Sequence, residues 1–572
     1  MLLCRAMEPN QHIPRARWVL ILVLLASLAG ILDRDLWTPD EPRDAAISME
    51  MGRSGNYVIP RLAGEPFIEK PPLYFAVAGM AEQGLGRWLG PVGAIRLTSA
   101  LWGLGVLSMT FLLVRRLSNA ETALLSAVLL GTMVGFVENM HWIRVDAALA
   151  FFVIAAVWAF GEVFAGQRAG FCLPAGLFTG LAFLSKGTIG PVLIAIGWAA
   201  LAIPRWMLQR REKSPLQLYI APHLLALAAC VAASGVWILL LRTVGGEELW
   251  NEWFWQNQVG RMQGTTTQLG HLYPGVWWYY LQTVAVYSLP WLPLLAIALG
   301  RWILKIKARP REYSLRSFLL SPTLFAVLWG GGSILVLTQS VTKRDLYLLP
   351  VLPAFSLLCA IGIRDALPRW ASAFYRFFLW LCAVVLLLLA LSPLLLSLAP
   401  EKLHATLPPL LATWTLRHLV VALACLGAFL VARSRQPVTA LNLAASMALV
   451  VISLFALPAK AVDEIKNMGP AYRAFAEQIP AEARPRVAAW NLSETARGEL
   501  YFHGGLSLTR LSDPSQIDLI LSGNDPRFDS VVLDWNKDLS EVVHRPYRLL
   551  AEARPGTGRR ARPIYWIQRD TE

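Results

Sequence analysis

The chain has 572 residues, of which 56% are hydrophobic and 16% are charged, and its mean hydropathy is +0.48. Soluble domains carry about 25% charged residues, so this composition excludes a disordered protein, a small disulfide scaffold and an ordinary soluble enzyme. Lys and Arg outnumber Asp and Glu by 52 to 38, which gives a net charge of +14. A basic surplus can indicate nucleic-acid binding, so its place along the chain decides what it means.

Long apolar runs recur from residue 18 to residue 457, and a helix that crosses a bilayer needs roughly 20 mostly apolar residues. The apolar segment 73–89 is broken by charged residues and glycines, so we expect an interfacial helix there, with a fourteenth span as the alternative. The runs predict thirteen membrane spans, at 18–32, 92–114, 120–138, 146–165, 170–184, 187–203, 217–241, 276–299, 318–338, 347–363, 374–399, 416–433 and 439–457.

The basic surplus lies in short segments between these spans, such as 205–213 and 301–316. With the N-terminus in the cytoplasm, thirteen spans place all of these segments on the cytoplasmic side, where Lys and Arg normally collect. The surplus therefore indicates membrane topology, and we expect no nucleic-acid partner. The predicted fold class is a polytopic α-helical membrane protein with a soluble C-terminal domain on the outer face.

From residue 459 the composition becomes that of a soluble α/β domain, with as many acidic as basic residues. The predicted organisation is a transmembrane catalytic domain over 1–458, with an outer loop at 33–91 that carries interfacial helices, and a soluble domain over 459–572. Within the soluble domain the sequence predicts strands at 487–490, 530–535, 548–551 and 563–568, and helices at 465–478 and 513–522.

Motifs of several other classes are missing from the sequence. No Cys-x-x-Cys spacing occurs, so neither a disulfide framework nor a thiolate zinc site is indicated. The sequence has no P-loop and no Gly-x-Gly-x-x-Gly that opens a helix. We therefore expect no nucleotide cofactor.

Three carboxylates fall at the predicted outer ends of spans. Asp40 and Glu41 are adjacent, and Pro39 and Pro42 restrict the backbone on either side of them. Such carboxylates can act as a base or orient a sugar hydroxyl; the alternative for Asp40 is a helix N-cap. Asp146 lies at the beginning of another predicted apolar helix. The helix dipole alone can explain a carboxylate there; the alternative is that Asp146 faces the same cavity as Asp40.

The same face carries an unusual set of cations, although the positive-inside rule disfavours them there. Lys186 lies in the turn of an apolar hairpin, where it either meets an anion or extends to the interface. Lys70, Arg261 and the adjacent Lys343 and Arg344 complete the set. A lipid phosphate is the anion that such a group of cations favours. Carboxylates and cations beside a bilayer suit transfer from a lipid-linked phosphate donor.

The motifs resemble those of the integral-membrane C-type glycosyltransferases, above all the lipid A aminoarabinose transferases and the bacterial relatives of the protein O-mannosyltransferases. The resemblance runs in order from about residue 18 to about residue 365. It is carried by Asp40-Glu41-Pro42, Phe67-Ile68-Glu69-Lys70-Pro71, Val145-Asp146, Ser185-Lys186-Gly187, Phe254-Trp255 with Gln258 and Arg261, Trp277-Trp278-Tyr279-Tyr280, Ser288-Leu289-Pro290-Trp291, and Lys343 with Tyr347.

This resemblance implies thirteen spans, interfacial helices in the first outer loop and a soluble C-terminal domain. It implies an undecaprenyl-phosphate sugar as donor and inversion at the anomeric carbon. Carried over to this sequence, Asp40 is the catalytic carboxylate with Glu41 beside it. Glu69 and His271 match positions where a divalent metal ion is plausible in the aminoarabinose enzymes.

The remaining matched residues concern the charged ends of donor and acceptor. Lys70 and Lys343, with Lys186, are expected to contact the donor phosphate or an acceptor anion. Tyr347 is expected to help place the carrier phosphate. The sequence departs from the aminoarabinose pattern at 256–258, where an acidic-His pair is typical, and at 344–345, where an apolar-Pro pair is typical.

These departures leave the acceptor open between lipid A, another envelope glycolipid and protein Ser or Thr. We expect an enzyme of the bacterial inner membrane that works on the periplasmic side. A transporter of lipid-linked glycans is the alternative; it needs ionisable residues near mid-membrane, whereas those of this chain gather at span ends. A structural subunit is a third class, and it predicts that the outer carboxylates are replaceable.

Overall fold

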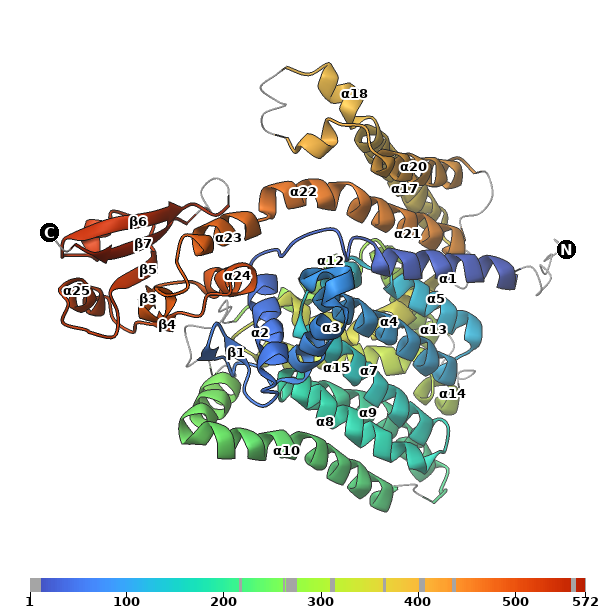
Figure 1. Ribbon diagram of the computed structural model, residues 1–572. Helices are drawn as coiled ribbons and strands as arrows, with labels where there is room; N and C mark the ends of the chain where they lie inside the picture. The colour runs from blue at the N-terminus through green and yellow to red at the C-terminus, as the bar shows by residue number, and fades with distance from the viewer. Residues whose placement is uncertain are drawn as a thin grey trace. The chain divides into compact units, whose positions relative to one another are not determined.

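The computed structural model of the chain describes residues 12–215, 219–260, 263, 275–308, 314–363, 367–400, 407–434, 439–556 and 562–570. Most of them are helical (Figure 1). The chain forms two compact units. We call the larger the membrane unit; it comprises Met1–Gly30, Glu69–Pro71 and Ser99–Pro458. We call the other the head unit; it comprises Ile31–Ile68, Pro72–Thr98 and Ala459–Glu572.

Ten helices of the described residues are long and apolar enough to cross a membrane, and two bent pairs raise the number to twelve. A shorter apolar helix at Trp18–Leu28 matches the first of the thirteen predicted spans. The apolar helices are α1 (His12–Leu28), α4 (Pro91–Leu117), α5 (Ala120–Leu130) with α6 (Val134–Met140), α7 (Val145–Phe164), η2 (Ala169–Phe171) with α8 (Cys172–Lys186), α9 (Ile189–Arg211), α10 (Ile220–Asn251) with η3 (Glu252–Gly260), α12 (Tyr279–Tyr287) with α13 (Leu292–Ala308), α15 (Pro322–Gln339), η4 (Asp345–Val351) with α16 (Leu352–Ile363), α17 (Arg369–Ala390), α20 (Leu416–Arg433) and α21 (Ala440–Ala456). The predicted polytopic helical fold is therefore confirmed.

The spans predicted at 120–138 and 276–299 are not continuous helices, because each is broken into two helices. The first bends by 63° between α5 and α6, and the second by 113° between α12 and α13. Pro290 lies in the second break, and a proline has no N–H to continue a helix. Because of these breaks, neither of the two apolar segments forms one straight helix across the membrane.

Two helices form the centre of the membrane unit. The apolar windows of Val145–Phe164 and Asp345–Ile363 are 89% buried, compared with 22% for Ile220–Gly260. A helix that is apolar on all sides belongs inside a bundle, and both windows have that character, with mean hydropathy above 2. Asp146 and Tyr347 lie at the beginning of these two central elements.

The head unit contains two helices of the first loop, α2 (Asp40–Ser54) and α3 (Leu73–Leu89), and the short hairpin of β1 (Arg61–Leu62) and β2 (Glu65–Pro66). Gly52 and Gly79 meet where α2 crosses α3, and a Cβ atom on Gly79 would lie 2.3 Å from the Ser48 carbonyl oxygen. The helix predicted at 73–89 is thus confirmed. It is shorter than the helices that qualify as membrane spans.

The C-terminal part of the head unit is the predicted α/β domain. Its five-stranded sheet has the order β4-β3-β5-β7-β6, in which β3 is parallel to β4 and β5 while β7 is antiparallel to β5 and β6. Its elements are α22 (Pro458–Lys466), α23 (Gly469–Glu477), β3 (Val487–Trp490), α24 (Glu494–Gly504), β4 (Thr509–Arg510), α25 (Ser515–Leu521), β5 (Ser530–Asp534), β6 (Tyr547–Ala553) and β7 (Ile564–Arg569).

The central strand β5 divides the core of this domain. Val532 packs into a cluster with Phe475 and Leu500, whereas Val531 packs with Ile517 on the other side of the sheet. Side chains alternate between the two faces of a strand, so one strand serves both clusters. All four predicted strands are present, and the helices predicted at 465–478 and 513–522 correspond to α23 and α25. The elements α22, α24 and β4 were not predicted.

Candidate active site

Asp40 is the first residue of α2, so the alternative that it caps this helix is wrong. Pro39 holds the N-cap position, and no side chain caps the helix. The Asp40 carboxylate accepts a hydrogen bond of 3.3 Å from the Arg43 guanidinium one turn later. Asp40 is 5% exposed. The expected catalytic carboxylate is therefore buried and held by a cation of its own helix.

Glu41 lies in a cage of donors and has no solvent exposure. Arg34 and Arg96 each donate to both of its oxygens, at 2.8–3.3 Å, and the Trp37 backbone N–H adds a bond of 2.9 Å. Burial raises the pKa of Glu41, but the charges and hydrogen bonds of the two arginines outweigh it and bring the pKa to about 2. Glu41 thus stays ionised and ties the loop before α2 to the start of α4.

Asp146 and Lys186 form an ion pair within the membrane unit, across the packed helices α7 and α8. The two side chains are 5% and 11% exposed. Asp146 lies in the first turn of α7, as the sequence predicted, and Lys186 is the last residue of α8. The protein therefore supplies the anion that Lys186 was expected to need.

Three further predicted residues gather around this pair. The Lys186 ammonium lies 4.6 Å from the centre of the Tyr347 ring. Lys70 and Arg344 are both near enough to Lys186 to act on its charge, and Lys70 is 6% exposed. We call Lys70, Asp146, Lys186, Arg344 and Tyr347 the cation cluster. Residues from four separate stretches of sequence thus meet at the ends of the central helices.

Lys343 and Asp345 flank Arg344 and have different surroundings. The Lys343 ammonium donates to the Ser340 carbonyl oxygen, and Lys343 is 2% exposed. Burial lowers the pKa of the Lys343 ammonium. The Asp345 carboxylate accepts a hydrogen bond from the Tyr279 hydroxyl. Lys343 therefore bonds to the residue that follows α15, and Asp345 bonds to α12.

Arg261 and His271 were predicted as site residues and lie outside the described residues. Glu69, the proposed metal partner of His271, is described and half-buried. Within the described part of the chain, no group of three or more His, Cys, Asp or Glu side chains could hold a metal ion. Because His271 lies outside the described residues, the pairing of Glu69 with His271 at a metal ion stays a prediction.

Sequence reasoning missed Arg43, whose guanidinium contacts Asp40 and also donates to Asp44 at 2.8 Å. An Asp-x-x-Arg spacing on a helix brings such a pair together, and this signal was available. It also missed α24. Ser493 caps that helix by accepting from the Ala496 N–H, and Gly505 ends it in a left-handed conformation, which is the usual pattern of helix ends.

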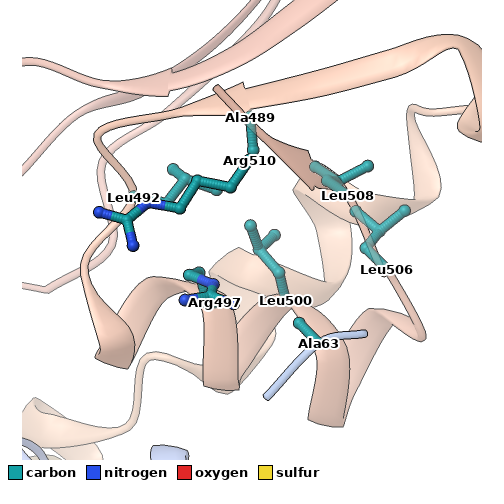
Figure 2. A pocket seen from close by; sticks show the side chains of 8 residues that line it. All are labelled: Ala63, Ala489, Leu492, Arg497, Leu500, Leu506, Leu508 and Arg510. Carbon is teal, nitrogen blue, oxygen red and sulfur yellow. The ribbon is translucent and has the colours of Figure 1, made fainter. Parts of the chain in front are cut away.

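A pocket of the head unit contains none of the predicted site residues (Figure 2). Arg497 and Arg510 line it together with apolar side chains. Its lining residues are Ala63, Ala489, Leu492, Arg497, Leu500, Leu506, Leu508 and Arg510. Ala63 belongs to the β1–β2 turn, so this pocket marks where the hairpin of the first loop meets the α/β domain.

Comparison with known proteins agrees with these features. The family model described as dolichyl-phosphate-mannose-protein mannosyltransferase matches residues 88–238. The undecaprenyl phosphate-alpha-4-amino-4-deoxy-L-arabinose arabinosyl transferase 2 of Pseudomonas fluorescens (strain Pf0-1) is 31% identical over 367 residues, or 61% of this chain and 60% of that protein. The corresponding transferase 1 of Sodalis glossinidius (strain morsitans) is 30% identical over 395 residues, which make up 66% of this chain and 64% of that protein. The matched part spans less than two thirds of each relative.

A solved structure, ArnT from Cupriavidus metallidurans bound to undecaprenyl phosphate, matches the fold with a TM-score of 0.70 and 20% identity over 98% of both chains. Its apo state gives a TM-score of 0.68. The resemblance that the ordered motifs indicated is thereby confirmed. The chain has the fold of the integral-membrane C-type glycosyltransferases, and its sequence is similar to those of the aminoarabinose transferases.

Proposed function

We propose that the protein is an inverting glycosyltransferase that moves a sugar from an undecaprenyl-phosphate-linked donor to lipid A or another glycolipid of the cell envelope. We place it in the bacterial inner membrane with its active site facing the periplasm. The names of its relatives support an aminoarabinose-type donor. The basic residues of the loops between spans support this orientation.

The observation that carries the proposal is the cation cluster. The charges of Lys70 and Arg344 both act on Lys186, which pairs with the Asp146 carboxylate at the end of an apolar helix. Charged groups beside a membrane are costly and usually serve a function. A phosphate joined to a long lipid matches this setting, because its charge meets the cations while its chain stays in the apolar phase.

In the proposed reaction an acceptor oxygen forms a bond to the anomeric carbon of the donor sugar. The bond from that carbon to the phosphate oxygen breaks on the opposite face, and undecaprenyl phosphate leaves with the electron pair. The cation cluster stabilises the charge that develops on the phosphate. As the resemblance implies, Asp40 takes the proton of a hydroxyl acceptor; a phosphate acceptor is already ionised and needs no base.

A protein Ser or Thr hydroxyl is the second candidate acceptor. The match of residues 88–238 to the protein mannosyltransferase model favours it. Such an acceptor needs a base, because a hydroxyl is a weak nucleophile before it loses its proton. The two candidates differ in the product, which is a modified glycolipid in one case and a glycopeptide in the other.

Reconstitution tests the function directly. The purified full chain, in liposomes, receives labelled undecaprenyl phosphate-aminoarabinose together with lipid A or with a Ser/Thr-rich peptide. Label that moves to lipid A supports the proposal, and label on the peptide supports the second candidate. Translocation of the donor without any new glycosidic product would contradict both and favour a transporter.

A further inference from the structure

The helix α24 of the α/β domain packs directly on α2 within the head unit (Figure 1). The Thr495 hydroxyl donates to the Pro39 carbonyl oxygen at 3.3 Å, and Arg497 donates to the Leu62 carbonyl oxygen at 2.7 Å. A Cβ atom on Gly498 would lie 2.6 Å from the Pro42 carbonyl oxygen. A glycine is therefore required where the two helices touch, beside the residues that follow Asp40.

Arg43 joins α24 to Asp40. Its guanidinium donates through Nε to Asp44 at 2.8 Å, through Nη1 to Glu494 at 2.9 Å and through Nη2 to Asp40 at 3.3 Å. The Arg43 and Asp44 side chains are 8% and 1% exposed, whereas that of Glu494 is 40% exposed. One buried cation thus serves three carboxylates, one of which comes from a helix more than 450 residues later in the sequence.

The geometry of the guanidinium gives these bonds unequal roles. A guanidinium is planar and donates in fixed directions, so two short bonds, to Asp44 and Glu494, fix its plane and its distance from α2. The third bond, to Asp40, is the longest of the three. Asp40 is thus held in place by a cation whose charge is shared with two other carboxylates.

We propose that Glu494 is a positioning residue for Asp40: through Arg43, the α/β domain sets the position of the catalytic carboxylate. This inference rests on the proposed function, in which Asp40 acts on the acceptor. It assigns a task to the C-terminal domain, whose own pockets and strands hold none of the predicted catalytic residues within the described chain. Without Glu494, the Arg43 guanidinium turns toward Asp40 and pairs with the Asp40 carboxylate more tightly.

The test compares turnover and binding in full-length protein in liposomes, with undecaprenyl phosphate-aminoarabinose and lipid A. Glu494→Ala is expected to lower kcat by about tenfold, since misplaced catalytic groups cost up to about a hundredfold. KM for the donor should stay within about twofold, because Glu494 acts on Asp40 alone. Glu494→Gln keeps the length of the side chain and should fall between wild type and Glu494→Ala.

The matched control is Glu541→Gln, which removes an ion pair with Lys537 in the same domain at similar exposure, 45% against 40%. It should leave kcat unchanged. A double-mutant cycle with Arg43→Lys separates positioning from general damage, because two residues that act through each other are not additive. Additive losses for Arg43→Lys and Glu494→Ala would overturn the inference.

Hydrogen exchange gives a readout that does not depend on turnover. Amides at the start of α2 should exchange faster in Glu494→Ala than in wild type, with the thermal midpoint unchanged. Unchanged exchange in Glu494→Ala overturns the positioning role of Glu494. So does a kcat of Glu494→Ala equal to that of wild type, provided that the wild type transfers sugar. Absence of transfer by the wild type, with faster exchange in the variant, contradicts the proposed function and leaves the Glu494–Arg43 link supported.

Discussion

Lys186 at the end of α8 pairs with Asp146 in the first turn of α7, and its ammonium also lies over the ring of Tyr347. Two residues 40 positions apart thus share one buried site. The pairing predicts a different role for each residue: Lys186 provides charge for a phosphate, and Asp146 offsets part of that charge.

The first prediction concerns the charge of this pair. Lys186→Met removes a cation from the cluster and should weaken binding of undecaprenyl phosphate about 10- to 100-fold, because a hydrogen bond to a charged group contributes roughly 1.5–3 kcal/mol. Asp146→Asn leaves the cation and should bind at least as tightly as wild type. The ligand-dependent shift of the thermal midpoint measures both.

Lys537→Met serves as the control for these variants, since Lys537 is an exposed residue of the α/β domain, paired with Glu541. Its midpoint shift should equal that of wild type. Equal binding by Lys186→Met and wild type would remove Lys186 from the phosphate site.

The second prediction concerns the stability that Glu41 provides. Glu41→Gln leaves Arg34 and Arg96 buried without their carboxylate, and the loss of one partner of a buried pair costs about 3–5 kcal/mol. Glu247→Gln breaks an exposed pair with Arg242 and should cost about 0–1 kcal/mol. Thermal unfolding in detergent compares the two variants, and equal losses would contradict the structural role of Glu41.

The same residue predicts a pH dependence. The folded-state pKa of Glu41 is about 2, below its ordinary value of 4.5, so the folded state binds fewer protons than the unfolded state between these values. The stabilisation is therefore complete above about pH 4.5 and is lost as pH falls toward about 2. Glu41→Gln should lack this part of the acid-induced loss, and a slope identical to wild type would refute the assignment.

The fold was predictable where one stretch of sequence holds all of the information. Long apolar runs gave the spans, and the segment 73–89 gave α3 to the residue. The partner of Lys186 was not predictable, since it depends on which helices pack together. Arg43 and α24 left local signals, an Asp-x-x-Arg spacing and a Ser493 cap, whereas the contact of Arg43 with Glu494 is purely tertiary.

The third prediction tests the crossing of α2 and α3. Gly79→Ala places a methyl group against the backbone of Ser48 and Gly52 and should destabilise the protein by about 1–3 kcal/mol. Gly84→Ala on the same helix meets no atom within 4 Å and should stabilise it by up to about 1 kcal/mol. Unfolding midpoints of the pair report the difference, and a Gly79→Ala variant as stable as Gly84→Ala would contradict the close approach.

The fourth prediction addresses orientation. Ser512 is an exposed residue between β4 and α25, and Ser512→Cys should react with a membrane-impermeant thiol reagent in spheroplasts. The native cysteines lie outside the α/β domain, so wild type is the control. Labelling that requires lysis of the inner membrane would reverse the proposed topology.

Transfer by wild type and by Asp40→Asn is the most direct measurement of the central claim, that Asp40 serves sugar transfer from a lipid-linked phosphate. Both proteins receive labelled undecaprenyl phosphate-aminoarabinose and lipid A in liposomes, and mass spectrometry detects the product. We predict modified lipid A with wild type, and in Asp40→Asn a loss of turnover by several orders of magnitude with undecaprenyl phosphate binding retained. Turnover by Asp40→Asn equal to that of wild type would contradict the account.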